Sequence, residues 1–203
     1  LHLLGNGVEL APSTSRTYDG RIETGANVIW DDFGSFLPQV DDLKNLNESY
    51  RATLTVTVSS LWTDTAQLTI PVSVLAHNEW FNAPIFYDSL AAFVQPNTRA
   101  VSAVLDTASD LLQKDTGDSS LGGYQSGPER AALIANAVYE ALHSRRIRYI
   151  DPPASFENTG QKVRTTSQVL DERFGTCIDL TVTYAACLEA AGIRPLVWLM
   201  NGH

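Results

Sequence analysis

The spacing of the apolar residues changes near residue 80, and this change constrains the fold more than any other feature. Before it, apolar side chains alternate with polar ones, as in Leu54, Val56, Val58 and again in Leu68, Ile70, Val72, Val74. A period of two is typical of strands with one buried face. Beyond residue 80, apolar residues recur every three or four positions, which is helical spacing. The sequence therefore predicts an α+β protein.

The first 80 residues predict a small antiparallel β-sandwich of the immunoglobulin-like kind. The segments 54–58 and 68–74 are joined by a polar link, 60–65, that suits a hairpin. Pro71 indicates an edge strand, because proline lacks the N–H of a ladder hydrogen bond. Further strands are expected around 7–10 and 27–30, and the remaining segments contain Gly, Asn and Asp, which are typical of turns. No chemical site is apparent here, so a presenting or docking role is expected.

The second part, 81–203, predicts helices at 97–114, from Pro128 to about residue 142, and at 177–191. Proline suits the first turn of a helix, where its missing N–H has no partner to lose. A short strand at 147–150 and a short helix at 167–173 are also expected. The Gly- and Ser-rich segment 116–127 lacks the spacing of a phosphate loop. It is either an ordered connector or a loop flanking a cleft.

A candidate nucleophile lies at the start of the last predicted helix. Thr176 can act as the N-cap and Asp179, three residues later, completes a short capping box. Cys177 then occupies the first helical position, where unpaired N–H groups and the helix dipole stabilise a thiolate. The alternative is a small buried structural side chain. Gly192 suits the position just after this helix.

His203 is the candidate base. A helix from Cys177 to residue 191 rises roughly 21 Å at about 1.5 Å per residue. The segment 193–203 spans up to about 33 Å if it is extended as a strand. A strand that returns along the helix can therefore bring His203 level with Cys177, although a structural histidine is the alternative.

The sequence predicts neither a disulfide nor a metal site. Cys187 lies about 15 Å along the same helix from Cys177, which is too far for a disulfide, and its small apolar neighbours predict a core position. The sequence contains no C-x-x-C or H-x-x-x-H spacing. We therefore expect no metal and no cofactor.

The charge balance bears on partners and location. With 23 acidic and 14 basic residues the formal net charge is −9, which opposes direct binding to nucleic acid or anionic membrane. Two unpaired cysteines favour a reducing, cytoplasmic location. No signal peptide and no apolar run of about 18 residues is found. The chain starts without Met and ends on a histidine expected in mid-element, so we expect a piece of a longer protein.

Several separated motifs carry a resemblance to a known family. The runs VLDERFGTCIDL at 169–180, YAA at 184–186 and AGIRP at 191–195 resemble the transglutaminase-like branch of papain-fold cysteine enzymes. GDSS at 117–120, GYQS at 123–126, PPASFE at 152–157 and GQKVR at 160–164 look like the amino-terminal region of very large bacterial proteins. Those proteins carry a domain of unknown function, a superfamily 1 helicase and a restriction-endonuclease-like C-terminal domain.

The resemblance implies a fold, an activity and roles for three residues. Residues 81–203 would be a transglutaminase-like domain cut after the catalytic histidine, with Cys177 as nucleophile and His203 as general base. Gln161 would be an oxyanion donor or, alternatively, a brace for its loop. The third member, an Asp or Asn, would follow His203. The implied activity is cysteine-dependent hydrolysis or acyl transfer on a peptide or protein, beside the other domains of the parent protein. The fragment alone is expected to be inactive, and a non-catalytic binding or sensing module is the alternative.

Overall fold

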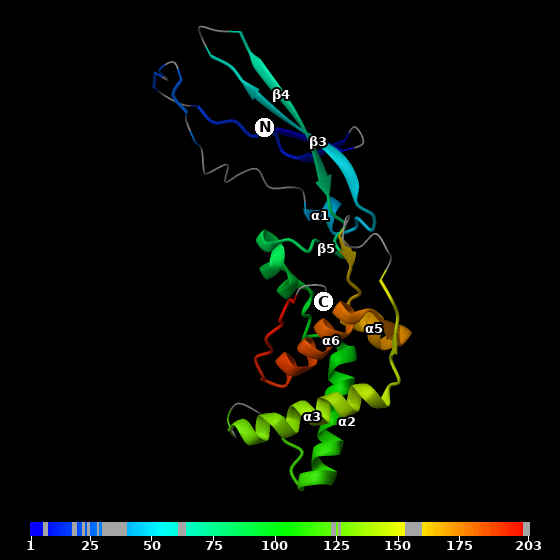
Figure 1. Ribbon diagram of the computed structural model, residues 1–203. Helices are drawn as coiled ribbons and strands as arrows, with labels where there is room; N and C mark the ends of the chain where they lie inside the picture. The colour runs from blue at the N-terminus through cyan, green and yellow to red at the C-terminus, as the bar shows by residue number, and fades with distance from the viewer. Residues whose placement is uncertain are drawn as a thin grey trace. The chain divides into compact units, whose positions relative to one another are not determined.

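The computed structural model describes residues 1–5, 8–17, 20–21, 23, 25–27, 29, 40–60, 64–122, 125, 127–152 and 160–200. The chain divides into two compact units, Leu1–Glu79 and Trp80–His203 (Figure 1). A four-stranded antiparallel sheet occurs in the first unit and most helices occur in the second. The α+β class predicted from the change in apolar spacing is therefore confirmed.

The first unit is built on a sheet with the strand order β2-β1-β3-β4. The strands are β1 (His2–Gly5), β2 (Val8–Ala11), β3 (Tyr50–Val58) and β4 (Ala66–Val74), all antiparallel to their neighbours. A short helix, α1 (Val40–Leu43), precedes β3. The strands predicted at 54–58 and 68–74 are confirmed as parts of β3 and β4. The expected strand at 27–30 and the link at 60–65 lie partly outside the described residues.

The pairing of β3 with β4 is regular over its whole length, from Tyr50 opposite Val74 to Val58 opposite Ala66. Pro71 lies opposite Thr53, and β4 is an edge of the sheet, as predicted. The small core of this unit gathers at one end of the sheet, around Leu3, Leu10, Ala11 and Ala52. The described residues of the unit form this one sheet, so they do not include the second layer of a sandwich.

The second unit contains the 3-10 helix η1 (Pro84–Phe93) and the helices α2 (Arg99–Thr116), α3 (Pro128–Ser144), α5 (Thr166–Glu172) and α6 (Cys177–Ala190). Local signals set their ends. The Thr98 hydroxyl caps α2 by accepting from the Val101 N–H at 3.2 Å, and Gly117 ends it in a left-handed conformation. Pro128 begins α3 as predicted. The core between α2, α3 and α6 contains residues such as Val104, Ile134, Val138, Ala186 and Cys187.

Two short strand pairs converge on the first turn of α6. β6 (Arg148–Tyr149) runs parallel to β8 (Phe174–Gly175), which directly precedes the helix. β7 (Gln161–Lys162) pairs with β5 (Glu79–Trp80). These pairings bring the two segments that flank the residues 153–159 toward one helix end.

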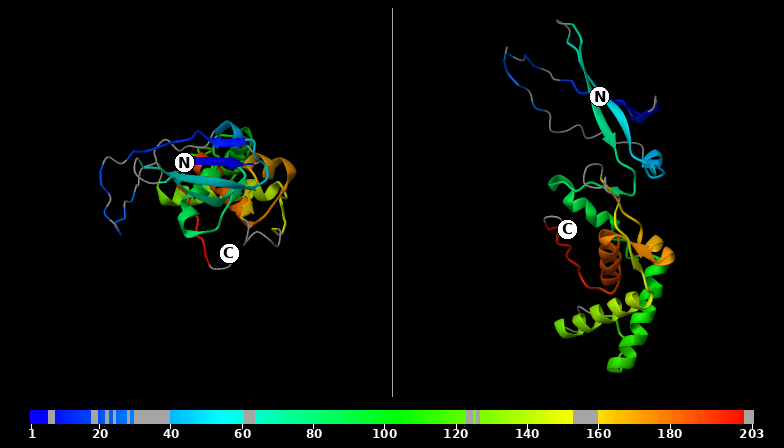
Figure 2. Two further views of the ribbon diagram at one scale, coloured as in Figure 1. Left: turned by 90° about the horizontal axis from the view of Figure 1, so that it is seen from above. Right: turned by 45° about the vertical axis from the view of Figure 1, so that its right-hand side comes forward.

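The segment after α6 runs back beside that helix (Figures 1 and 2). The predicted strand over 193–203 is wrong for its described part, because residues 193–200 have no strand conformation. The physical reason is the lack of a neighbouring strand among the described residues, so that Leu196 and Trp198 are 74% and 81% exposed. No helix in the described part of the chain is long and apolar enough to span a bilayer.

Candidate functional site

The first turn of α6 combines a capped helix end with an exposed thiol. Thr176 is the N-cap, and its hydroxyl accepts from the Asp179 N–H at 3.5 Å. The Asp179 carboxylate in turn accepts from the Thr176 N–H at 2.9 Å. The predicted capping box is therefore confirmed. Cys177 is the first residue of the 14-residue helix and is exposed, whereas Thr176 and Asp179 are buried. The thiol lies at the positive end of the helix dipole.

The two cysteines occupy opposite environments on the same helix. Cys187 is completely buried in the core between α2, α3 and α6, as predicted. Burial raises the pKa of the Cys187 thiol to about 12, although the nearby Arg145 acts in the opposite direction. A thiol so placed stays protonated and cannot reach a reagent in the folded protein. Cys177 is therefore the accessible thiol of the pair.

Gln161 lies at the same helix end. It is the first residue of β7, it is half-buried, and its side-chain Nε2 donates to the Thr176 hydroxyl at 3.2 Å. The structure thus brings Gln161 close to the residue that precedes Cys177. Its amide already binds the N-cap side chain, which is the contact that a loop-bracing role requires.

A buried ion pair fixes the loop after β7 to the start of α6. The Asp179 carboxylate accepts from the Arg164 backbone N–H at 2.8 Å and from the Arg164 guanidinium at 3.0 Å. The guanidinium also lies 4.8 Å from the centre of the Phe174 ring and 3.9 Å from a Glu172 carboxylate oxygen. Asp179 is completely buried. Its carboxylate therefore serves both the capping box and an inter-segment ion pair.

Tyr149 is a site residue that the sequence analysis missed. It is paired with Gly175 in the β6–β8 ladder, and the Ile150 N–H donates to the Gly175 carbonyl at 3.0 Å. Desolvation, the Asp151 carboxylate and the Cys177 thiol all raise the pKa of Tyr149, and Asp151 also forms a hydrogen bond with its side chain. The phenol therefore stays protonated, and its single O–H is engaged with the Asp151 carboxylate. The sequence indicated the strand itself, but not the parallel partner that brings Tyr149 toward Cys177.

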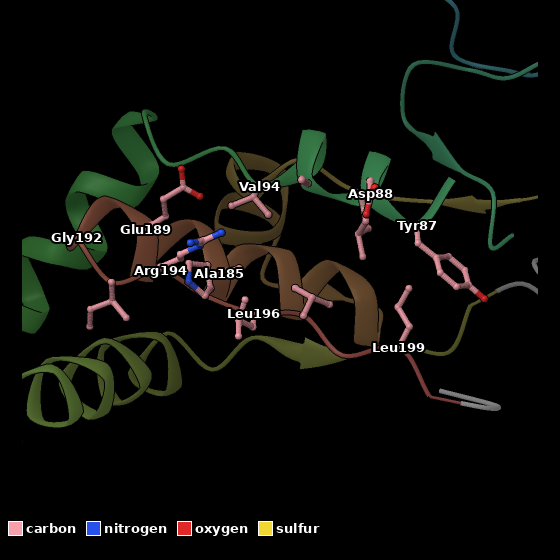
Figure 3. Close-up of a pocket in the computed structure, with 14 residues that line it drawn as sticks. Tyr87, Asp88, Val94, Ala185, Glu189, Gly192, Arg194, Leu196 and Leu199 are labelled. Carbon is pink, nitrogen blue, oxygen red and sulfur yellow. The ribbon is translucent and has the colours of Figure 1, made fainter. Parts of the chain in front are cut away.

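A groove runs along α6 between that helix, η1 and the segment after Gly192 (Figure 3). Its volume is about 970 Å³. Apolar residues such as Leu90, Val94, Ala185, Leu196 and Leu199 form much of its lining, and charged residues Asp88, Glu189 and Arg194 lie among them. The groove can accommodate an extended, largely apolar chain segment.

His203 lies outside the described residues, so its position relative to Cys177 stays a prediction. No group of three His, Cys, Asp or Glu side chains that could hold a metal ion occurs in the described part of the chain. Comparison with known proteins finds no matching family model, no matching curated protein and no matching solved structure.

Proposed function

We propose that the second unit is a transglutaminase-like module of the papain-like fold, carried by a larger bacterial helicase/nuclease protein. In this proposal it hydrolyses an amide bond or transfers its acyl group, and the first unit completes an immunoglobulin-like sandwich. The observation that carries the proposal is the exposure of Cys177 at the first position of α6. A helix start with free N–H groups is where enzymes place thiolates.

The proposed chemistry uses groups at this helix end. The Cys177 thiolate attacks the acyl carbon of a peptide or protein substrate, and an S–C bond forms as the carbonyl oxygen becomes an oxyanion. The Cys177 backbone N–H can help to hold that oxygen. His203 takes the thiol proton as general base and gives it to the departing amine as the oxyanion collapses and the C–N bond breaks. Water or an amine then attacks the resulting thioester, giving its own proton to His203 as the C–S bond breaks and the thiolate is released.

The test is the reactivity of the thiol in this chain. We expect iodoacetamide to alkylate Cys177 near neutral pH about tenfold faster than it alkylates glutathione, because the helix end favours the thiolate. Mapping the adduct by mass spectrometry assigns the rate to Cys177, and Cys177→Ser removes the fast phase. Cys187→Ala is the matched control and leaves that phase unchanged. A Cys177 thiol that reacts no faster than glutathione would contradict the proposal.

The second candidate is a non-catalytic module that binds a peptide or senses a partner. The groove along α6 favours it, because an extended apolar segment would find both a helix wall and polar groups there. Peptide binding that is unchanged by Cys177→Ser, together with ordinary thiol reactivity, would select this candidate.

A further inference from the structure

The acidic half of the capping box creates an electrostatic problem for a nucleophilic thiolate. Asp179 lies two residues after Cys177 on the first turn of α6, and its carboxylate is completely buried. Little water is available there to screen its negative charge. An uncompensated carboxylate on the same helix turn as the sulfur opposes the formation of a second anion there. The Asp179 side chain therefore caps the helix and also opposes the thiolate that the proposed chemistry requires.

Arg164 supplies the compensation. Its guanidinium contacts the Asp179 carboxylate at 3.0 Å, and its backbone N–H holds the other carboxylate oxygen at 2.8 Å. The guanidinium lies over the Phe174 ring, and its Nε is 3.9 Å from a Glu172 carboxylate oxygen. The Arg164 side chain is 30% exposed while that of Asp179 is 0% exposed, so the pair is screened on one side only. A fixed cation is thus held against Asp179, the buried acid of this helix end among the residues that the structure describes.

We infer that Arg164 is a positioning residue for the Cys177 thiolate, acting by neutralising the buried Asp179 carboxylate. This inference rests on the proposed function, since it concerns the same thiol. Arg164 then does two things through one contact: it fixes the loop after β7 to the helix start, and it cancels a charge that would suppress the thiolate. Among the described residues, the titratable groups Tyr149, Asp151, Lys162 and Glu172 also lie near this end, and none of them is changed in the variants below.

An electrostatic role and a purely structural role of the Arg164–Asp179 pair predict different changes in the reactivity of Cys177. If Arg164 and Asp179 only hold the helix end together, removing either one loosens it and changes Cys177 reactivity in the same direction. If they balance charge, Arg164→Gln leaves the carboxylate unpaired and disfavours the thiolate. Asp179→Asn has the opposite effect, because the Arg164 cation remains without its counter-charge. The double variant removes both charges and returns reactivity close to the starting value.

The experiment measures the rate of Cys177 alkylation by iodoacetamide near neutral pH, with adducts mapped to each cysteine. We expect about tenfold slower alkylation in Arg164→Gln, severalfold faster alkylation in Asp179→Asn, and a rate within about twofold of the wild type in the double variant. Lack of Cys187 adduct shows that each variant stays folded. Arg164→Lys, which keeps the charge, is expected to retain most of the wild-type rate.

The outcomes separate this inference from the proposed function. Slower alkylation in both single variants, or no change in either, would overturn the charge-balance role while wild-type Cys177 could still be a fast thiol. If Arg164→Gln unfolds the protein and exposes Cys187, the variants Arg164→Lys and Asp179→Asn are compared in its place. A retained alkylation rate in Arg164→Lys with a faster rate in Asp179→Asn supports the inference. A slower rate in Asp179→Asn overturns it. A wild-type Cys177 no faster than glutathione contradicts the proposed function instead.

Discussion

Replacing Gly175 with alanine tests how tightly β8 packs against the first turn of α6. A Cβ at Gly175 would lie 3.0 Å from the Asp179 Cβ and 3.5 Å from both the Asp179 Oδ2 and the Leu180 Cδ2. The first distance is shorter than the roughly 3.5–4.0 Å of an ordinary carbon–carbon contact. Gly175 is not among the glycines with positive φ, so the cost comes from this contact and not from backbone strain.

The magnitude follows from three contributions. Overpacking of this kind costs about 1–3 kcal/mol. Moving Asp179 aside would weaken hydrogen bonds to a charged group, each worth about 1.5–3 kcal/mol. In the opposite direction, a Gly-to-Ala change reduces the conformational freedom of the unfolded chain, which stabilises the folded protein by about 0.4–1 kcal/mol. We therefore expect Gly175→Ala to lower the free energy of unfolding by about 2–5 kcal/mol.

Urea unfolding followed by the helical circular dichroism signal measures this change. The long helices α2, α3 and α6 lie in the second unit and α1 in the first has four residues, so the helical signal of the described residues comes mainly from the unit that contains the site. Gly122→Ala is the matched control, because its Cβ would meet only the Ser120 hydroxyl oxygen, at 3.5 Å. Equal effects of the two substitutions would refute the tight contact between β8 and Asp179.

Two further predictions use the core of the second unit. Ile134→Ala, at a completely buried position, should cost about 2–5 kcal/mol in urea unfolding, whereas Leu133→Ala, at 47% exposure, should cost less than about 1 kcal/mol; equal losses would contradict the described core. The folded-state pKa of Cys187 is raised from 9.0 to about 12, so its contribution to stability is complete below pH 9 and is lost as the pH rises from about 9 to about 12. The unfolding free energy should fall over that window by on the order of 4 kcal/mol from this group, and Cys187→Ala should flatten the curve; an unchanged slope would count against the burial of the thiol.

The sequence predicted those features whose cause is local. The ends of α3 and α6 follow from Pro128, Thr176 and Gly192, since capping acts within one turn. β3 and β4 follow from the alternation of apolar residues. By contrast, β1 escaped detection because four residues show too little alternation, and η1 because its apolar residues repeat without a clear helical period.

The site was only partly predictable, and the reason is its dependence on non-local contacts. The accessibility of Cys177 and the burial of Cys187 follow from helix position and neighbouring residue types. The approach of Tyr149 requires the β6–β8 pairing, and the Arg164–Asp179 ion pair joins a loop to a helix across 15 positions. Two-residue strands and loop arginines carry no pattern that specifies such partners.

The proline in β4 has a consequence for how this protein behaves at high concentration. An outer strand with a continuous row of free N–H and C=O groups is a template on which further chains can add as strands and grow into fibres. Leu68 of β4 is 59% exposed and Val58 of β3 is 60% exposed. The two strands therefore carry apolar surface that an added strand could bury. Pro71 interrupts the row of donors near the middle of the nine-residue strand. Replacing it with threonine would supply the missing N–H, so we expect the variant to aggregate more readily at high concentration.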